Sequence, residues 1–378
     1  MAAGCDLTIH EYPDNEISTP IVNFTLNLNF DTEMPLYTVM ELSKKSRADI
    51  SPDDLDVRYI INVYRNTNAR QESRDIIQQR IVTKDDITVL NHSVDFQLDE
   101  GDYIFLVWAD YVDAGTTNHK FYNADNFESI SLITENNIYI PANTDYRDAF
   151  RGRQTATVSA QNEENAATVE MKRPFAKYRF VTTDLEEFIT KMIALKAKAE
   201  AERRAQEAAA RGENGTENEE PEGTKGDDTD DTKVDTKLEV NLEDYYVIFE
   251  YAGWVNVAYN AYTDRSDISL QGMRFRSDIR RINATDAEIG FDYVIVNSSE
   301  DSETGREFIP QVELRLHVYQ KSETPDGEDV EVGGFAKRFI DLKRSHLTEV
   351  RGKFLSSQAD GAVGISPGFD DEFTYEIK

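Results

Sequence analysis

Apolar and polar residues alternate almost without fault between positions 21 and 30. Because successive side chains of a β-strand point to opposite faces, this alternation predicts a strand with one face in a core and one in water. The apolar positions are Val22, Phe24, Leu26, Leu28 and Phe30, and the polar positions between them are Asn23, Thr25, Asn27 and Asn29. We therefore expect residues 21–30 to be an integral strand of a β-sandwich.

Similar short apolar runs recur along the rest of the chain, with turn-forming residues between them. They lie at 56–65, 86–98, 103–112, 128–133 and 166–171, and then at 174–180, 245–262, 289–297, 310–320, 335–342 and 372–377. Short strands that follow one another without helices predict an antiparallel β-sandwich. The pattern therefore indicates an all-β protein.

One segment departs from this pattern. Thr183 and Glu186 have the spacing of a capping box, and the apolar residues that follow recur at helical intervals, which predicts a helix over 184–211. Residues 213–237 supply acidic and small residues without an apolar anchor, so we expect a disordered acidic loop there. We expect helix and loop to be inserted into the second of two sandwiches. The predicted division is a tether at 1–20, an N-terminal sandwich at 21–172 and a C-terminal sandwich at 173–378.

Charge and length exclude several classes of function. The 378 residues carry a formal net charge of −31, with 72 acidic and 41 basic side chains. A surface this acidic repels phosphate backbones, so nucleic acid is not expected as a partner. No run approaches the roughly 18 apolar residues that a membrane-spanning helix needs. A single cysteine leaves no internal disulfide, so packing must supply the stability.

The sequence offers no catalytic or metal-binding pattern. Its five histidines are scattered, and neither a phosphate-binding loop nor a Gly-x-Ser-x-Gly elbow is present. Carboxylates are so abundant that any chosen pair is uninformative, and the run at 227–231 supports only weak cation attraction. We therefore expect no enzyme, no cofactor and no metal site. The histidines are His10, His92, His119, His317 and His346.

The two tryptophans offer a different possibility. Trp108 and Trp254, with nearby tyrosines, could form a platform that stacks on sugar rings. Each lies in a strongly apolar run, and large aromatic side chains in such runs usually fill a core. We therefore predict that both are core residues. Which way they face separates an adhesin from a surface glycan-binding protein.

Cys5 is the only cysteine, and it follows Ala2, Ala3 and Gly4. Small residues and a glycine before a cysteine are typical of the end of a bacterial lipoprotein signal, where the cysteine carries lipid. The alternative is an ordinary buried thiol. Residues 6–20 favour a lipid attachment site at Cys5, because they are polar and interrupted by proline, as in a tether.

Several stretches resemble a family of Bacteroidales surface lipoproteins of unknown function that is related to fimbrillins, the major and minor fimbrial subunits. The resemblance covers most of the chain except 196–240. It is carried by Leu106–Gly115, Lys120–Asn123, Asp145–Gly152, Met171–Phe180, Thr183–Phe188 and Val363–Asp370. It implies two transthyretin-like Greek-key sandwiches, export as an outer-membrane lipoprotein, and a place at the cell surface in adhesion or as a minor pilus component.

The resemblance also implies a way of assembling. In fimbrillins a trypsin-like protease cuts after an arginine and frees the first strand, and the vacated groove accepts a strand from the next subunit. The first basic residues after 21–30 are Lys44, Lys45 and Arg47, which makes Arg47 the candidate processing site. The expected partners are then other pilus subunits or host and bacterial surface ligands. A lipid-anchored subunit that never polymerises fits the resemblance equally well.

Overall fold

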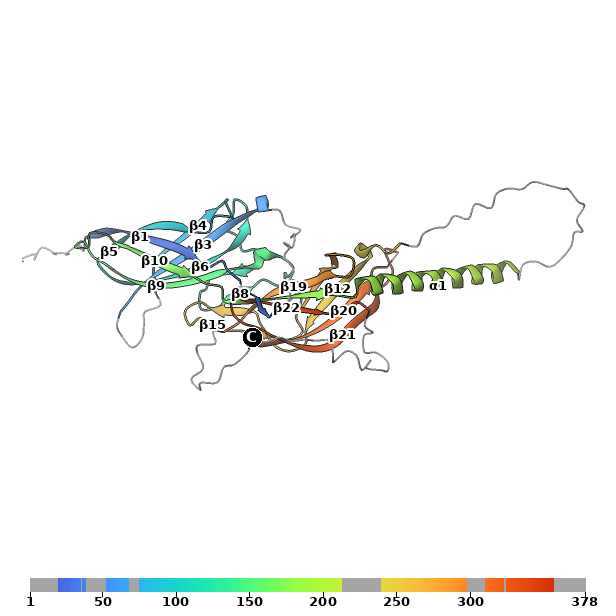
Figure 1. The fold of residues 1–378 in the computed structure, drawn as a ribbon. Coiled ribbons are helices and arrows are strands. Elements are labelled where there is room, and N and C mark those ends of the chain that lie inside the picture. The colour runs from blue at the N-terminus through green and yellow to red at the C-terminus, as the bar shows by residue number, and fades with distance from the viewer. Residues whose placement is uncertain are drawn as a thin grey trace, which may run out of the picture.

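The computed structural model describes residues 20–34, 36–38, 52–67, 75–212, 239–297, 310–322 and 324–356. In this part of the chain β-strands predominate and a single α-helix is present, which confirms the prediction of an all-β protein with one helix (Figure 1). The transthyretin-like Greek-key detail and the exact domain limits stay predictions.

Two sheets face each other in the first part of the molecule. The three-stranded sheet has the order β10-β1-β5, and the four-stranded sheet has the order β4-β3-β6-β9. Their apolar faces share one core cluster, because alternate residues of each strand point inward. The strands are β1 (Ile21–Phe30), β3 (Leu55–Arg65), β4 (Ile76–Lys84), β5 (His92–Asp99), β6 (Gly101–Asp113), β9 (Phe150–Val158) and β10 (Ala166–Met171).

Strand β6 is buried on both of its faces. Phe105 and Val107 point into the core shared with β1, whereas Leu106 and Trp108 belong to the larger cluster of the second part. The ring of Trp108 lies 6.4 Å from that of Phe175 and 6.0 Å from that of Tyr259, centroid to centroid. The two parts of the chain are thus packed against each other through the back of the β3–β6 sheet.

The second part is also built from two larger sheets, with orders β18-β19-β11-β22-β2 and β17-β12-β20-β21, and from the smaller sheets β13-β16 and β15-β14-β8-β7. The strands of the larger sheets are β2 (Leu36–Thr38), β11 (Phe175–Thr182), β12 (Tyr245–Tyr251), β17 (Arg274–Asp278), β18 (Arg280–Arg281), β19 (Ala287–Ile295), β20 (Gln311–Gln320), β21 (Val330–Asp341) and β22 (Leu347–Gly352). Those of the smaller sheets are β7 (Tyr122–Asn123), β8 (Ile130–Leu132), β13 (Val255–Asn256), β14 (Ala258–Asn260), β15 (Arg265–Ser266) and β16 (Ser269–Leu270).

The helix α1 (Leu185–Gly212) begins in the core and then runs away from the body of the molecule (Figure 1). Leu185, Phe188 and Met192 are buried, whereas Leu195 is already half exposed. The buried carboxylate of Asp184 fixes the start of the helix by accepting hydrogen bonds from the backbone and hydroxyl of Ser356. Propensity and i,i+4 ion pairs support the outer half, such as the pair Arg203–Glu207 at 3.1 Å.

Several predicted strands differ from those observed. The run at 86–98 contains a turn, and its strand begins only at His92; the run at 245–262 breaks into β12, β13 and β14. The predicted runs do not include β4, β9, β17 and β22, nor the short strands β2, β7, β15, β16 and β18. The predicted strand at 372–377 lies outside the described residues. The sheets are also not purely antiparallel, because β1 pairs in parallel with β10, and β22 in parallel with both β11 and β2.

Candidate functional site

Strand β1 occupies the centre of the outer three-stranded sheet. It pairs antiparallel with β5 from Ile21 to Leu28 and parallel with β10 from Thr25 to Phe30. Its alternate residues are buried as predicted, with Phe24 1%, Leu26 0% and Leu28 2% exposed. The ring of Phe24 stacks on that of Phe105 across the core, at 4.9 Å between centroids. β1 thus forms a hydrogen-bond ladder with a neighbouring strand on each of its two edges, and it contributes one face to the core.

The other face of β1 is polar and reaches solvent. Thr25 donates a hydrogen bond to Asp95 of β5 at 2.7 Å, and the amide nitrogen of Asn29 donates to Glu170 of β10 at 2.9 and 3.0 Å. The hydroxyl of Ser93 donates to the amide oxygen of Asn27 at 2.7 Å. Side-chain contacts on this face are few and exposed, so they hold β1 only weakly.

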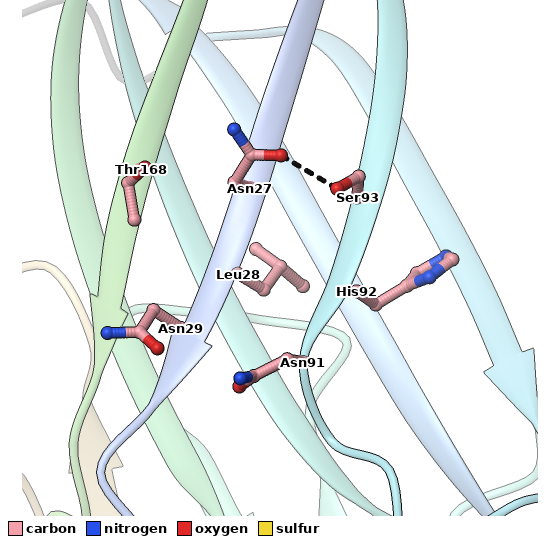
Figure 2. Close-up of a pocket in the computed structure, with 7 residues that line it drawn as sticks. All are labelled: Asn27, Leu28, Asn29, Asn91, His92, Ser93 and Thr168. Atoms are coloured by element: carbon pink, nitrogen blue, oxygen red, sulfur yellow. Dashed lines mark hydrogen bonds between the residues drawn. The ribbon is translucent and has the colours of Figure 1, made fainter.

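A shallow depression of about 590 Å³ lies on this face, where β5 begins and β1 approaches its end. Figure 2 shows the residues that line it, with the Asn27 amide turned toward Ser93 and His92 pointing away from β1. The lining residues are Asn27, Leu28, Asn29, Asn91, His92, Ser93 and Thr168. The depression thus draws on all three strands of the sheet and on the residue before β5.

Two features hold the geometry of this depression. The side-chain oxygen of Asn91 accepts a hydrogen bond from the backbone N–H of Phe30 at 2.9 Å, beyond the point where the β5 ladder ends. The imidazole of His92 lies 5.8 Å from the ring of Tyr59. Partial burial and, to a lesser degree, the positive charge of Lys84 lower the pKa of His92, so the imidazole is uncharged at neutral pH. The depression therefore presents neutral polar groups.

The tryptophan prediction is half right. Trp108 is fully buried, and its indole N–H donates to Asp110 at 3.1 Å. Trp254 is 64% exposed, so the prediction that it is a core residue was wrong. The reason is local: Ala252 and Gly253 both bond through their backbone N–H to the carbonyl of Glu313, which ends β12 in a turn that carries Trp254 outward.

Buried ion pairs are a feature that sequence reasoning missed. Arg58 of β3 donates to both carboxylate oxygens of Asp110, at 2.9 and 2.7 Å, and both side chains are at most 2% exposed. Arg147 is also paired with the buried Asp292, through a single contact to one carboxylate oxygen. Such pairs are costly to desolvate but specify one arrangement of the elements that carry them. In sequence these residues are indistinguishable from the many other charged side chains.

The candidate residues for processing and anchoring cannot be placed. Cys5, Lys44, Lys45, Arg47 and the acidic loop at 213–237 lie outside the described residues. In the described part of the chain, no group of three or more metal-ligating side chains is present. There too, no helix combines the length and apolar character that crossing a membrane requires.

The chain belongs to a family of unknown function, DUF6562, whose model matches residues 18–378. This match confirms the recognition from sequence of a family without a known function. None of the curated proteins matches the chain in sequence.

Distant similarities to solved structures accompany the family match. A candidate adhesin from Bacteroides ovatus is 10% identical, with a TM-score of 0.39, over 97% of this chain and 99% of that one. The fimbrial anchor protein Mfa2 from Porphyromonas gingivalis is 8% identical, with a TM-score of 0.35, over 85% and 100% of the two chains. A fimbrial assembly protein from Parabacteroides distasonis is 11% identical, with a TM-score of 0.35, over 90% and 93%. At these values the similarities carry no conclusion about function.

Proposed function

We propose that this chain is a non-enzymatic, lipid-anchored cell-surface protein of the fimbrillin type, acting as an adhesin or as a minor pilus component. The observation that supports it best is the position of β1 in the middle of its sheet. If β1 left, a strand from another subunit could take its place between β5 and β10, and this would join the two subunits. Sequence resemblance to the fimbrillin-related lipoproteins supports the same assignment.

The energetics of β1 suit such an exchange. Burying Phe24, Leu26 and Leu28 contributes roughly 1.5–3 kcal/mol for each side chain. Removal of β1 would leave β5 and β10 without their shared neighbour and would expose the core beneath. A strand of like pattern from another subunit restores both the core and the hydrogen-bond ladders. The exchange is therefore favourable once the first strand has been released.

Cleavage after Arg47 is the step that would release β1 in this proposal. The test is to treat the purified chain with a trypsin-like protease and to look for SDS-resistant ladders on gels. We expect ladders from the native sequence and none from the triple variant Lys44→Ala, Lys45→Ala, Arg47→Ala. Cleaved protein that stays monomeric, with residues 21–30 still bound, would contradict the polymer and favour a monomeric adhesin.

Lipidation of Cys5 is the second element of the proposal. Expressed with a lipoprotein signal in a Bacteroidales host, the chain should partition into detergent and incorporate labelled palmitate, because two or more acyl chains give stable membrane attachment. The Cys5→Ser variant should be released into the medium. Cys5 that stays unlabelled under these conditions would remove the anchor and the outer-membrane location from the proposal.

The exposure of Trp254 favours a second candidate function, that of a surface glycan-binding protein. Trp254 directly precedes Val255 of β13, which pairs with the exposed Leu270 of β16. Exposed aromatic rings can stack on the apolar faces of sugars. If this site binds glycans, Trp254→Ala should abolish retention of the protein by polysaccharide gels, whereas Phe339→Ala, another exposed aromatic, should leave it unchanged.

A further inference from the structure

We propose that the depression on the outer face of the β10-β1-β5 sheet is a binding site for a neutral saccharide. The site is independent of strand exchange and of Trp254, and it would exist in the unprocessed monomer. Its lining, the state of its amides and the pairing of its strands each point to this class of ligand.

The lining is uncharged in a protein whose residues are 30% charged. On the polar face it combines the side chains of three asparagines, a serine and a threonine. Leu28 and His92 pair across the two strands and turn their side chains toward the core-facing side of the sheet. The nearest acidic group bonded to it is Glu170, which already accepts from Asn29. An anionic ligand would meet that carboxylate and no basic lining residue, and a cation would find amides in place of carboxylate ligands. The ligand that matches this lining carries hydroxyl groups and no charge.

Two side-chain amides of the depression, those of Asn27 and Asn29, each use only one of their two polar atoms in hydrogen bonds within the protein. Asn27 accepts from Ser93 through its oxygen, and Asn29 donates to Glu170 through its nitrogen. Among the described residues, no partner is bonded to the Asn27 amide nitrogen, the Asn29 amide oxygen or the Thr168 hydroxyl. The depression therefore offers a donor, an acceptor and a group that does both. Adjacent hydroxyls of a sugar, each able to donate and accept, match this set.

A polypeptide strand fits this site poorly. Between Thr25 and Leu28 the backbone of β1 is paired on one side with β5 and on the other with β10. A peptide could not pair with the backbone of β1 here, because strand addition needs a free edge. On β1 only side chains are available to a ligand, and together with those of β5 and β10 they lie on three strands spaced about 4.8 Å apart.

The polar face of the β17-β12-β20-β21 sheet provides a contrast. There the side chains satisfy one another: Tyr246 donates to Asp329 at 2.6 Å, and Arg274 is paired with Glu250 at 2.6 Å. His317 is bonded to Glu331 at 2.8 Å. A ligand would have to break these contacts before making its own. In the depression beside β1, the amides of Asn27 and Asn29 are each oriented by one hydrogen bond and keep a second polar atom for a ligand. This preorganisation lowers the entropy cost of binding.

The experiment uses the full unprocessed chain in affinity gel electrophoresis, with gels that contain dextran, yeast mannan or arabinan as neutral polymers and alginate or heparin as anionic ones. We expect at least one neutral polymer to retard the protein and neither anionic polymer to do so. The double variant Asn29→Ala, Thr168→Ala should lose at least tenfold in affinity. Asn23→Ala, on the same face of β1 but outside the depression, should bind as the native chain does.

The outcomes separate this site from the others. Retardation by the anionic polymers only, or by none of the polymers, would overturn the proposal, as would binding to an acidic peptide that the double variant also loses. If Asn23→Ala lost as much affinity for the neutral polymer as the double variant, the effect would belong to the whole sheet face, and the proposed site would be wrong. Circular dichroism and melting temperature establish that each variant is folded. The variant Thr168→Val keeps the shape of the side chain and removes only its hydroxyl, so it repeats the binding test with minimal perturbation. Loss of binding in Trp254→Ala alone would place the saccharide at Trp254 instead.

Discussion

Strands β1 and β11 hold corresponding positions in the two parts of the molecule. Each lies between one antiparallel neighbour and one parallel neighbour, β5 and β10 for β1, and β19 and β22 for β11. Each buries aromatic side chains against the facing sheet, with Phe24 on β1 and Phe180 on β11 fully buried. On their inner faces the two strands are equivalent.

Their outer faces differ. On β1 the outer face carries small neutral side chains with few exposed hydrogen bonds, whereas on β11 it carries Lys177 and Arg179. Lys177 is paired with Asp145 at 2.5 Å and lies 4.3 Å from the ring centroid of Phe291, and Arg179 is paired with the buried Glu349. Releasing β11 would break these partly desolvated contacts as well as the core. The comparison teaches that two strands with similar inner faces are held to very different degrees by the contacts of their outer faces.

The largest expected effect tests the equivalence of the inner faces. Phe24→Ala and Phe180→Ala should each lower the free energy of unfolding by about 3–5 kcal/mol, because each leaves a large cavity in a packed core. Denaturant unfolding, followed by fluorescence, measures both. A much smaller loss for Phe24→Ala would show that the inner faces already distinguish the strands.

An intermediate effect tests the outer faces. Arg179→Ala should cost about 1–3 kcal/mol, because the Glu349 side chain is only 1% exposed and would keep just the longer contact to Arg351 at 3.4 Å. The matched change on β1, Thr25→Ala, removes an exposed hydrogen bond and should cost less than about 0.5 kcal/mol. Equal costs in the same unfolding assay would remove the proposed difference between the strands.

A further small effect, which depends on pH, concerns the junction between the two parts. Asp264 bonds to Arg344 at 2.7 Å and lies 3.8 Å from Arg151 of β9. Burial alone would raise the pKa of Asp264, but the hydrogen bond and charge of Arg344, with the hydrogen bond of Tyr259 and the charge of Arg151, together outweigh it and lower this pKa. A lowered pKa stabilises the fold above the unfolded value near 3.9, and this contribution is lost as the pH falls toward the folded value.

The variant Asp264→Asn isolates that contribution, since asparagine tolerates the left-handed backbone at this position, where φ is 58°. The native chain should be more stable than the variant by less than about 1 kcal/mol at pH 6, because the carboxylate is 32% exposed. The gap in melting temperature should narrow at pH 3. A gap that stays constant with pH would mean that Asp264 is not the titrating group.

The sequence predicts those strands in which the apolar residues of the periodic pattern are also the residues that become buried. The alternation over 21–30 identifies β1 and its buried face, and the apolar run around Trp108 identifies a core strand. Trp254 lies in a similar run, but a backbone turn fixed by Glu313 exposes it, and no local pattern signals that turn. Strand β4 escapes prediction because its Ile76-Ile77-Gln78-Gln79 start does not alternate.

The depression beside β1 could not be predicted at all. Asn29 and Glu170 are 141 positions apart and meet only because β1 and β10 pair in parallel. The asparagines of β1 read simply as the solvent side of a strand, and Asn91 precedes β5 in what reads as continuous strand. Pairing brings these residues together, and periodicity within one strand shows which face is buried but not which distant strand is its neighbour.

The pairing of β1 also has a mechanical consequence. A pull on its N-terminal end, directed along the strand, loads the ladder to β5 and the ladder to β10 together, since both lie parallel to the force. The hydrogen bonds then resist in shear as one set, and no end bond can open before the others. In the strand exchange proposed above, a partner strand would displace β1 step by step from the side, whereas a steady axial tension would release it only with difficulty.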